Sequence, residues 1–149
     1  MSSDDYNPVE TREALGRPTM LNVAVSLVVK LKRRSVCKRM QQACIITDDD
    51  VSAIYAMGYN GRAAGESHEG CVEGIPGGCG CVHAEMNALV KLRTERGGLT
   101  LICTQSPCEL CARLIINSKM IKKVLFLETY RSTIPLLILT EAKIAWERI

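Results

Sequence analysis

The chain has 149 residues, of which 47% are hydrophobic and 23% charged, and its formal net charge is +3. This length and balance fit a single globular domain over residues 1–149 with a core of its own, and they exclude an intrinsically disordered chain. A charge this small does not by itself indicate a nucleic-acid-binding protein. Only 4% of the residues are aromatic, so aliphatic side chains must form most of the core.

Eight cysteines are the unusual feature of the composition. The N-terminal segment is polar and acidic, without the features of a secretory signal, and the longest apolar stretches are far shorter than the roughly 20 residues that span a bilayer. We therefore expect a cytoplasmic protein without membrane contact, in a reducing compartment where thiols rarely form disulfides. Metal binding or catalysis is then the expected use of the thiols, and a disulfide framework is the alternative.

Residues 1–18 are interpreted as an N-terminal extension. Thr19 can then cap a helix whose apolar residues lie on one face. That helix runs into residues 30–39, which contain six cations. The cations are either solvated at a helix C-terminus, which they stabilise, or they attract an anionic ligand such as a phosphate. Two apolar segments, 43–47 and 51–57, predict a β-hairpin with an acidic turn between them.

Residues 58–81 contain eight of the eleven glycines and three of the eight cysteines, and little that could form a core. So long a loop inside a compact domain is usually functional or disordered. Regular elements then alternate, with helices predicted over 83–96 and 107–118 and strands over 99–103 and 122–128. The tail, 133–149, fits either a helix or a last strand. This alternation predicts a layered α/β domain with a partly parallel sheet.

Two short motifs carry the chemistry. His83 and Glu85 stand at one predicted helix start, and Cys108 and Cys111 stand at another, just after Pro107. The positive potential of a helix N-terminus favours the thiolate that zinc requires. One imidazole and two thiolates are three ligands for a tetrahedral ion, and an open fourth position is typical of a catalytic zinc site. Glu85 cannot easily bind the ion from the same turn as His83, but it can move the protons of a water molecule there.

A structural zinc site is the alternative, because Cys79, Cys81 or Cys103 could fill the fourth position. The spacing of Cys79 and Cys81 does not supply the second C-x-x-C pair of a zinc ribbon. In this interpretation the protein is a non-catalytic zinc-binding module, and Glu85 only caps a helix.

The glycine-rich loop offers a second group of metal ligands. His68, Cys71, Cys79 and Cys81 lie within fourteen residues, and Cys37 could replace one of them. These residues either hold a second metal ion or remain as free groups in a mobile lid.

H-x-E followed by P-C-x-x-C is the signature of zinc-dependent nucleobase deaminases. Over residues 20–139 the chain resembles the deoxycytidylate (dCMP) deaminases of the zinc-dependent cytidine deaminase-like superfamily. The matching segments are residues 34–39, 58–61, 83–88 and 106–112, with a looser match at 128–131. The G-Y-N-G segment at 58–61 and Asn87, two residues after Glu85, favour this family over deaminases of tRNA adenosine or guanine.

The resemblance implies a three-layer α/β/α fold around a five-stranded mixed sheet, and zinc-dependent hydrolysis of dCMP to dUMP and ammonia. His83, Cys108 and Cys111 would hold the zinc. Glu85 would take a proton from the attacking water, protonate ring nitrogen N3 and later help the amino group to leave. Members of the family are usually homo-oligomers, and some of them carry an extra structural zinc. Deoxycytidine or another free cytosine nucleotide is the alternative substrate.

The resemblance also implies residues that contact the substrate: Asn60, Ala84, Ser106, Arg39, Tyr130 and Arg131. The backbone of Ala84 would hold the pyrimidine carbonyl and Asn60 the sugar. Tyr130 either closes over the base or belongs to the core. Arg39, Lys38 and Arg131 are candidates for binding the 5′-phosphate, and the alternative is a solvated surface position for each. The chain departs from the family at Met40, Gln42 and Ala43, where cationic and small residues are usual.

A deaminase that acts on RNA would need a basic groove and aromatic side chains on which bases stack. A net charge of +3 and an aromatic content of 4% give this alternative little support. The expected partner is therefore a small nucleotide and not a nucleic acid.

Overall fold

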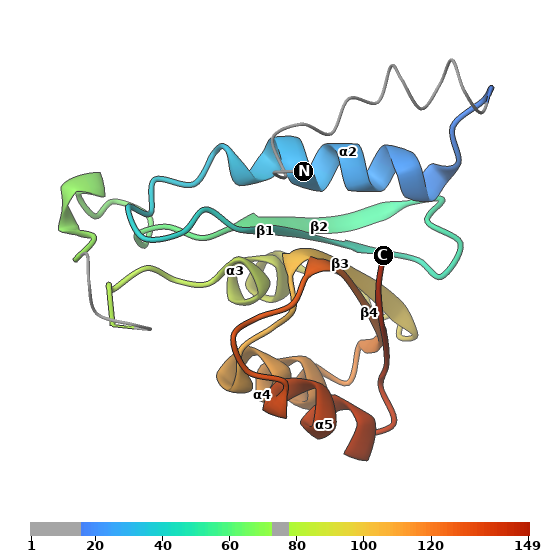
Figure 1. The fold of residues 1–149 in the computed structure, drawn as a ribbon. Helices are drawn as coiled ribbons and strands as arrows, with labels where there is room; N and C mark the ends of the chain where they lie inside the picture. The colour runs from blue at the N-terminus through green and yellow to red at the C-terminus, as the bar shows by residue number, and fades with distance from the viewer. Residues whose placement is uncertain (1–15, 73–77) are drawn as a thin grey trace.

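The computed structural model describes residues 16–72 and 78–149, so most of the predicted N-terminal extension lies outside the described residues. A five-stranded sheet with the order β2-β1-β3-β4-β5 forms the middle layer. Helix α2 covers one face of this sheet, and α3, α4 and α5 cover the other (Figure 1). This arrangement confirms the predicted three-layer α/β/α fold.

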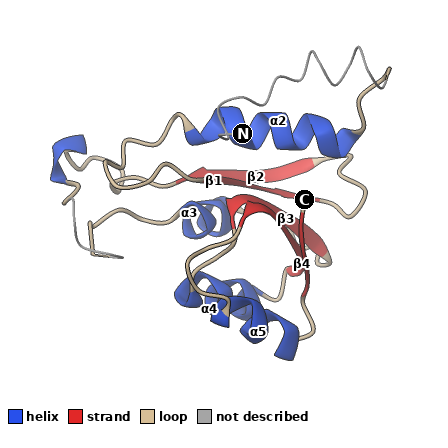
Figure 2. Cartoon of the chain, viewed as in Figure 1, coloured by secondary structure: helices blue, strands red, loops and turns tan. Residues whose placement is uncertain are grey.

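The sheet is mixed, because β2, β1 and β3 pair antiparallel whereas β3, β4 and β5 pair parallel. The strands are β1 (Ala43–Thr47), β2 (Ile54–Tyr59), β3 (Leu99–Gln105), β4 (Ile121–Glu128) and β5 (Ala145–Arg148). The helices are α2 (Met20–Lys32), α3 (Ala84–Lys91), α4 (Glu109–Ser118), α5 (Ile134–Glu141) and the 3₁₀ turn η1 (His68–Gly70) (Figure 2).

Local chemistry explains where α2 begins and ends. Thr19 and Asn22 form a capping box, in which the Thr19 hydroxyl accepts the Asn22 N–H at 3.1 Å and Asn22 Oδ1 accepts the Thr19 N–H at 3.2 Å. Lys30 and Lys32 stand in the last turn, where cations stabilise the negative end of the helix dipole. The predicted helix is therefore confirmed.

The predicted hairpin is confirmed, and the ambiguous tail contains both alternatives, a helix (α5) and then a strand (β5). The prediction that a helix extends to residue 96 is wrong, because α3 ends at Lys91. Leu92 turns to extended backbone and keeps its side chain packed against the core, while the mostly exposed residues 93–98 lead to β3.

Close packing of α3 on the sheet depends on Gly58 in β2. A Cβ atom at Gly58 would overlap the carbonyl oxygen of Ala84 and lie 2.6 Å from the backbone nitrogen of Ala88. Only a glycine therefore allows the N-terminal half of α3 to lie this close to β2. No helix in the described part of the chain is long and apolar enough to cross a membrane.

Candidate active site

Two helix N-termini bring the candidate metal ligands together. His83 is the N-cap of α3, Cys108 is the N-cap of α4, and Cys111 lies in the first turn of α4. Nδ1 of His83 lies 3.5 Å from Sγ of Cys108 and 3.4 Å from Sγ of Cys111. His83 comes 25 and 28 positions before Cys108 and Cys111 in the sequence, so the fold brings together the residues of the two motifs.

The geometry of these three atoms fits a zinc ion. Bonds of about 2.3 Å to sulfur and about 2.0 Å to nitrogen in a tetrahedral site place the ligand atoms about 3.5–3.8 Å apart. The observed separations of 3.4 and 3.5 Å are close to these values, and all three ligand atoms lie within 4.8 Å of one another. An imidazole with two thiolates is also a donor set that zinc prefers.

The cysteine thiols at the start of α4 differ in acidity. The Cys111 side chain, His83 and the Cys111 backbone N–H together lower the pKa of the Cys108 thiol to about 4. The neighbouring Cys108 sulfur and burial instead raise the pKa of the Cys111 thiol. These contacts favour the thiolate on Cys108, and a cation bound at this site would favour deprotonation of Cys111 as well.

Glu85 lies in the first turn of α3, two residues after His83, and is only 8% exposed. Burial raises the pKa of its carboxyl group, because a charged carboxylate loses solvation there. A carboxyl group of this kind beside a metal site can accept and return protons during a reaction.

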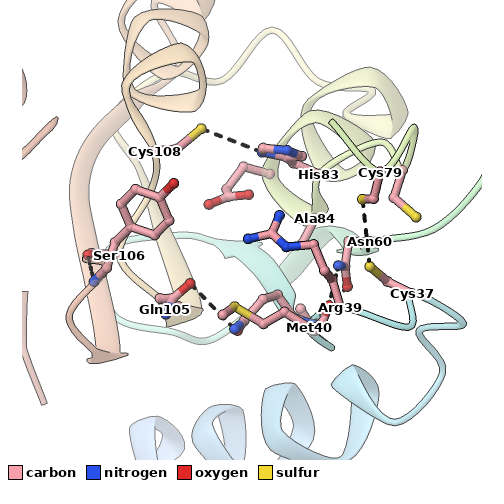
Figure 3. Close-up of a pocket in the computed structure, with 15 residues that line it drawn as sticks. Cys37, Arg39, Met40, Asn60, Cys79, His83, Ala84, Gln105, Ser106 and Cys108 are labelled. Atoms are coloured by element: carbon pink, nitrogen blue, oxygen red, sulfur yellow. Dashed lines mark hydrogen bonds between the residues drawn. The ribbon is translucent and has the colours of Figure 1, made fainter. Parts of the chain in front are cut away.

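A pocket opens beside these residues, between the N-termini of α3 and α4 and the ends of β1, β2 and β3 (Figure 3). Of the predicted site residues, the pocket is lined by Arg39, Asn60, Cys79, Cys81, His83, Ala84, Glu85, Ser106, Cys108 and Tyr130. Arg39 and Asn60 lie on one side of it and Ser106 and Cys108 on the other. The fold thus brings nearly all the predicted substrate-contacting residues to one pocket.

Asn60 performs a structural task inside this pocket. Its Oδ1 accepts the backbone N–H of Gln42 at 2.8 Å, and its Nδ2 donates to the carbonyl oxygen of Met40 at 2.6 Å. These two bonds fix the backbone of the segment that joins Arg39 to β1. Asn60 therefore shapes the pocket wall that carries Arg39.

Ser106 and Tyr130 are linked directly. The Ser106 hydroxyl is buried and accepts the backbone N–H of Tyr130 at 2.7 Å, which holds Tyr130 at the pocket edge. Arg131 is exposed and is not among the residues that line the pocket; its guanidinium lies over the Tyr130 ring, 5.3 Å from the ring centre.

Arg39 is the cation that the fold presents to the pocket. It is half-buried, and no hydrogen bond or ion pair engages its guanidinium within residues 16–72 and 78–149. The neighbouring Lys38 instead pairs with Glu69 at 3.6 Å. An unpaired guanidinium in a pocket is suited to an anionic group of a ligand.

Sequence reasoning missed one polar feature of the pocket wall, formed by Gln42, Thr104 and Gln105. The Thr104 hydroxyl accepts the Ala43 N–H at 3.0 Å and bonds to the Gln42 side-chain oxygen, while Gln42 Nε2 approaches Gln105 Oε1 at 3.5 Å. The available signal was the position of Gln105, directly before the Ser106-Pro107-Cys108 segment, together with the departure from the family at Gln42.

A second thiol cluster borders the pocket. The sulfur atoms of Cys37, Cys71, Cys79 and Cys81 all lie within 4.8 Å of one another. His68 is exposed in η1 and is not part of this cluster; Cys37 takes the place that the sequence interpretation gave first to His68.

Cys44 and Cys103 belong to neither group. They are fully buried and face each other across β1 and β3, as expected for small apolar strand residues.

Comparison with known proteins identifies the family. Residues 19–128 match the family described as the cytidine and deoxycytidylate deaminase zinc-binding region. A deoxycytidylate deaminase of Saccharomyces cerevisiae is 30% identical in an alignment of length 128 that covers 78% of this chain and 40% of the yeast protein. A probable deoxycytidylate deaminase of Caenorhabditis elegans is 36% identical in an alignment of length 106 that covers 64% of this chain and 50% of the nematode protein. The chain thus spans half or less of the length of these relatives.

Among solved structures, the dCMP deaminase of cyanophage S-TIM5 in complex with dCMP and dUMP matches with a TM-score of 0.73 and 30% identity, over 89% of this chain and 98% of that chain. The fold and the site define an α/β protein in which one histidine and two cysteines, a ligand set suited to zinc, lie beside a buried glutamate. The chain belongs to the cytidine and deoxycytidylate deaminase family, whose members share a zinc-binding region.

Proposed function

We propose that this protein is a zinc-dependent hydrolase that converts dCMP and water to dUMP and ammonia. The observation that carries the proposal is the buried Glu85 carboxyl group in the wall of a pocket that it shares with His83 and Cys108. The likeness to the cyanophage structure, which holds dCMP and dUMP, supports the same substrate here.

The proposed chemistry depends on proton transfer by Glu85. His83, Cys108 and Cys111 would hold a zinc ion, which when bound would supply a Lewis acid that makes water a nucleophile near neutral pH. Glu85 accepts a proton from the attacking water and delivers it to ring nitrogen N3 as the oxygen adds to C4. Glu85 then carries a second proton to the amino group, the C4–N bond breaks, and ammonia leaves. Burial of Glu85 favours the protonated carboxyl group that both deliveries require.

The start of α3 supports the binding of a pyrimidine. The Asn87 N–H donates to the carbonyl oxygen of His83, and the N–H groups of the preceding residues have no partner inside the helix. The Ala84 N–H is therefore available for the ring carbonyl of the base, which would orient C4 toward Glu85. Tyr130 at the pocket edge supplies an aromatic face for the same ring.

The 5′-phosphate is assigned to Arg39. Its guanidinium is half-buried in the pocket wall and is unpaired among the described residues, whereas Arg131 lies over Tyr130 and outside the lining. Charge-assisted hydrogen bonds from a guanidinium fit a phosphate well. This contact would distinguish dCMP from deoxycytidine.

We also propose that Cys37, Cys71, Cys79 and Cys81 hold a second, structural zinc. The sulfurs of Cys37 and Cys71 are 3.7 Å apart and those of Cys37 and Cys79 are 3.9 Å apart, close to the separation of about 3.8 Å that a tetrahedral zinc with four thiolates requires. The backbone N–H of Lys38 points to Sγ of Cys71 at 3.4 Å and lowers the pKa of that thiol to about 7, which favours the ligating thiolate. Six of the eight cysteines are then metal ligands, a use of thiols expected in a reducing compartment, so we propose a cytoplasmic location.

A homo-oligomer is the third part of the proposal. The helices α4 and α5 expose large apolar side chains, with Leu110 56%, Ile134 51% and Leu137 61% exposed. Side chains of this kind on neighbouring helices are typical of an interface between copies. Light scattering coupled to size-exclusion chromatography would give the mass, and a monomer at micromolar concentration would contradict this part.

The substrate is tested by ammonia release from equal concentrations of dCMP, CMP, deoxycytidine, dCTP, dAMP, guanine and a tRNA anticodon hairpin. We expect dCMP to be the preferred substrate. Equal rates with deoxycytidine would contradict the phosphate contact. No turnover of any compound by the zinc-loaded protein would contradict an enzymatic function.

A further inference from the structure

The guanidinium of Arg62 lies between the backbone segments that carry three of the four clustered cysteines. Gly70 directly precedes Cys71, and Gly80 separates Cys79 from Cys81. A Cβ atom at Gly70 would lie 3.0 Å from Cζ, Nε and Nη2 of Arg62, and a Cβ atom at Gly80 would overlap Nη1. The absence of side chains at these two glycines therefore makes the space that the guanidinium fills.

Polar contacts fix the guanidinium in this space. Nη1 of Arg62 donates to the carbonyl oxygen of Gly80 at 3.1 Å, and Nη2 pairs with Oε1 of Glu66 at 3.2 Å. The other oxygen of Glu66 accepts the backbone N–H of Ala63 at 2.9 Å, which anchors the carboxylate to the start of the loop. The Arg62 side chain is 19% exposed, and its Nε is buried without a partner among the described residues.

The same contacts hold the backbone next to the clustered cysteines. Glu66 already neutralises the guanidinium charge, so Arg62 acts by its position: it packs against the residues next to three of the ligands, as groups around a metal site commonly do. Gly80 has a φ of +81°, so its own backbone direction, which sets the orientation of Cys79 and Cys81, also requires a glycine.

We infer that Arg62 is a positioning residue for the four-cysteine metal site and, through that site, for one wall of the substrate pocket. The inference rests on the proposed second zinc. It extends that proposal, because Arg62 touches neither metal nor substrate and would act by holding the loop segments of Cys71, Cys79 and Cys81 in register.

The pocket lies next to this cluster. Cys37, Cys79 and Cys81 line the pocket together with Arg39 and Asn60 (Figure 3). Loss of the second ion would therefore loosen the wall that holds the sugar and phosphate, while Cys108 at the start of α4, on the other side of the pocket, would stay in place. Arg62 should affect the KM for dCMP much more than kcat.

The test compares the wild type with Arg62→Ala and Arg62→Lys, using metal binding as the main readout. Purified proteins are depleted of metal and titrated with Zn2+ against a chelator, and with Co2+, whose thiolate charge-transfer absorption increases with the number of bound sulfurs. We expect the wild type to bind two ions per chain. In Arg62→Ala the ion at the four-cysteine site should bind about 10- to 100-fold less tightly, so the four-thiolate absorption should need more Co2+ to develop while the two-thiolate absorption is unchanged.

Arg62→Lys keeps the positive charge but loses the planar guanidinium group. Its affinity for the second ion should therefore lie between those of the wild type and Arg62→Ala. Arg96→Ala is the control, since the guanidinium of Arg96 also donates a hydrogen bond, to the Tyr55 hydroxyl at 3.1 Å, but lies outside both metal clusters. Arg96→Ala should bind both ions like the wild type.

The outcomes separate the two proposals. A wild type that binds only one ion per chain would refute the second zinc itself. A wild type that binds two ions, with Arg62→Ala binding both equally well, would refute the role of Arg62 alone. If Arg62→Ala does not fold, as judged by circular dichroism, Arg62→Lys decides: unchanged affinity for both ions overturns the inference, and selective weakening of the second supports it.

Discussion

Asn60 and Met40 are joined by a hydrogen bond of 2.6 Å from the side-chain amide of Asn60 to the carbonyl oxygen of Met40, across 20 residues of sequence. The same amide accepts the backbone N–H of Gln42. A residue just after β2 therefore fixes the segment that leads from Arg39 into β1. This linkage couples the G-Y-N-G segment to the position of the proposed phosphate-binding cation.

Asn60→Ala should raise the KM for dCMP and lower thermal stability. Removing the amide leaves two polar backbone groups without their partners, at a cost of about 1–3 kcal/mol. Steady-state kinetics and a thermal melt measure both effects. An unchanged KM in a protein of lowered Tm would show that the Asn60 bonds stabilise the fold without positioning the substrate site.

Arg39→Ala should raise the KM for dCMP by about 10- to 100-fold, the equivalent of about 1.5–3 kcal/mol for a charge-assisted contact. The rate with deoxycytidine should not change, because that substrate has no phosphate. Arg131→Ala is the matched control, and we expect it to behave like the wild type. A similar loss in both variants would place the phosphate at the protein surface near Tyr130.

Glu85→Gln should keep the zinc of the His83–Cys108–Cys111 centre and lose turnover. The amide is nearly the same size but cannot carry a proton, so we expect kcat to fall by about 10²- to 10⁴-fold. Zinc content by mass spectrometry and ammonia release by a coupled assay measure the two properties. Turnover close to that of the wild type would contradict the proposed proton transfer.

Gly58→Ala should destabilise the domain, because the added methyl group would overlap the backbone of Ala84 at the start of α3. We expect a loss of about 1–3 kcal/mol, typical of overpacking, from denaturant titration. The control is Gly97→Ala, where a Cβ would meet only the Lys119 carbonyl oxygen, 3.8 Å away. Equal stability of the two variants would contradict the close approach of α3 and β2.

Asp48 should make the hairpin turn sensitive to acid. The Ser52 hydroxyl and the backbone N–H groups of Ala53 and Ser52 lower the pKa of Asp48 from 3.8 to about 2. A carboxylate with a lowered pKa contributes stability above its unfolded pKa, and this stability is lost as the pH falls from about 4 to 2. The Tm advantage of the wild type over Asp48→Asn should therefore be present near pH 7 and shrink below about pH 4. A constant difference would contradict this assignment.

The two motifs of the proposed active site were predictable because their chemistry is local. His83 and Glu85 share one turn, Cys108 and Cys111 share another, and both pairs stand at helix starts that the sequence marks. The alternation of elements also predicted the layers. It could not fix the end of α3, because the apolar pattern continues through Leu92, which still packs against the core in extended backbone.

The second thiol cluster was only partly predictable. Cys71, Cys79 and Cys81 are close in sequence, but Cys37 comes from the segment after α2, and its distance to the loop depends on the whole sheet. A histidine three residues before Cys71 looked an equally suitable ligand. Cys37 and not His68 is the fourth member of the cluster, because the 3₁₀ turn η1 leaves His68 exposed at the surface.

The β-bridge between Gly61 and Val82 joins the two ends of the long loop by a pair of backbone hydrogen bonds of 3.1 and 2.7 Å. Because the loop leaves and returns at one point, the geometry of the sheet does not depend on how many residues the loop contains. Lengthening or shortening the loop changes closure entropy only slowly. The loop can therefore change in length without displacing β2 before it or α3 after it, the two elements that flank the pocket.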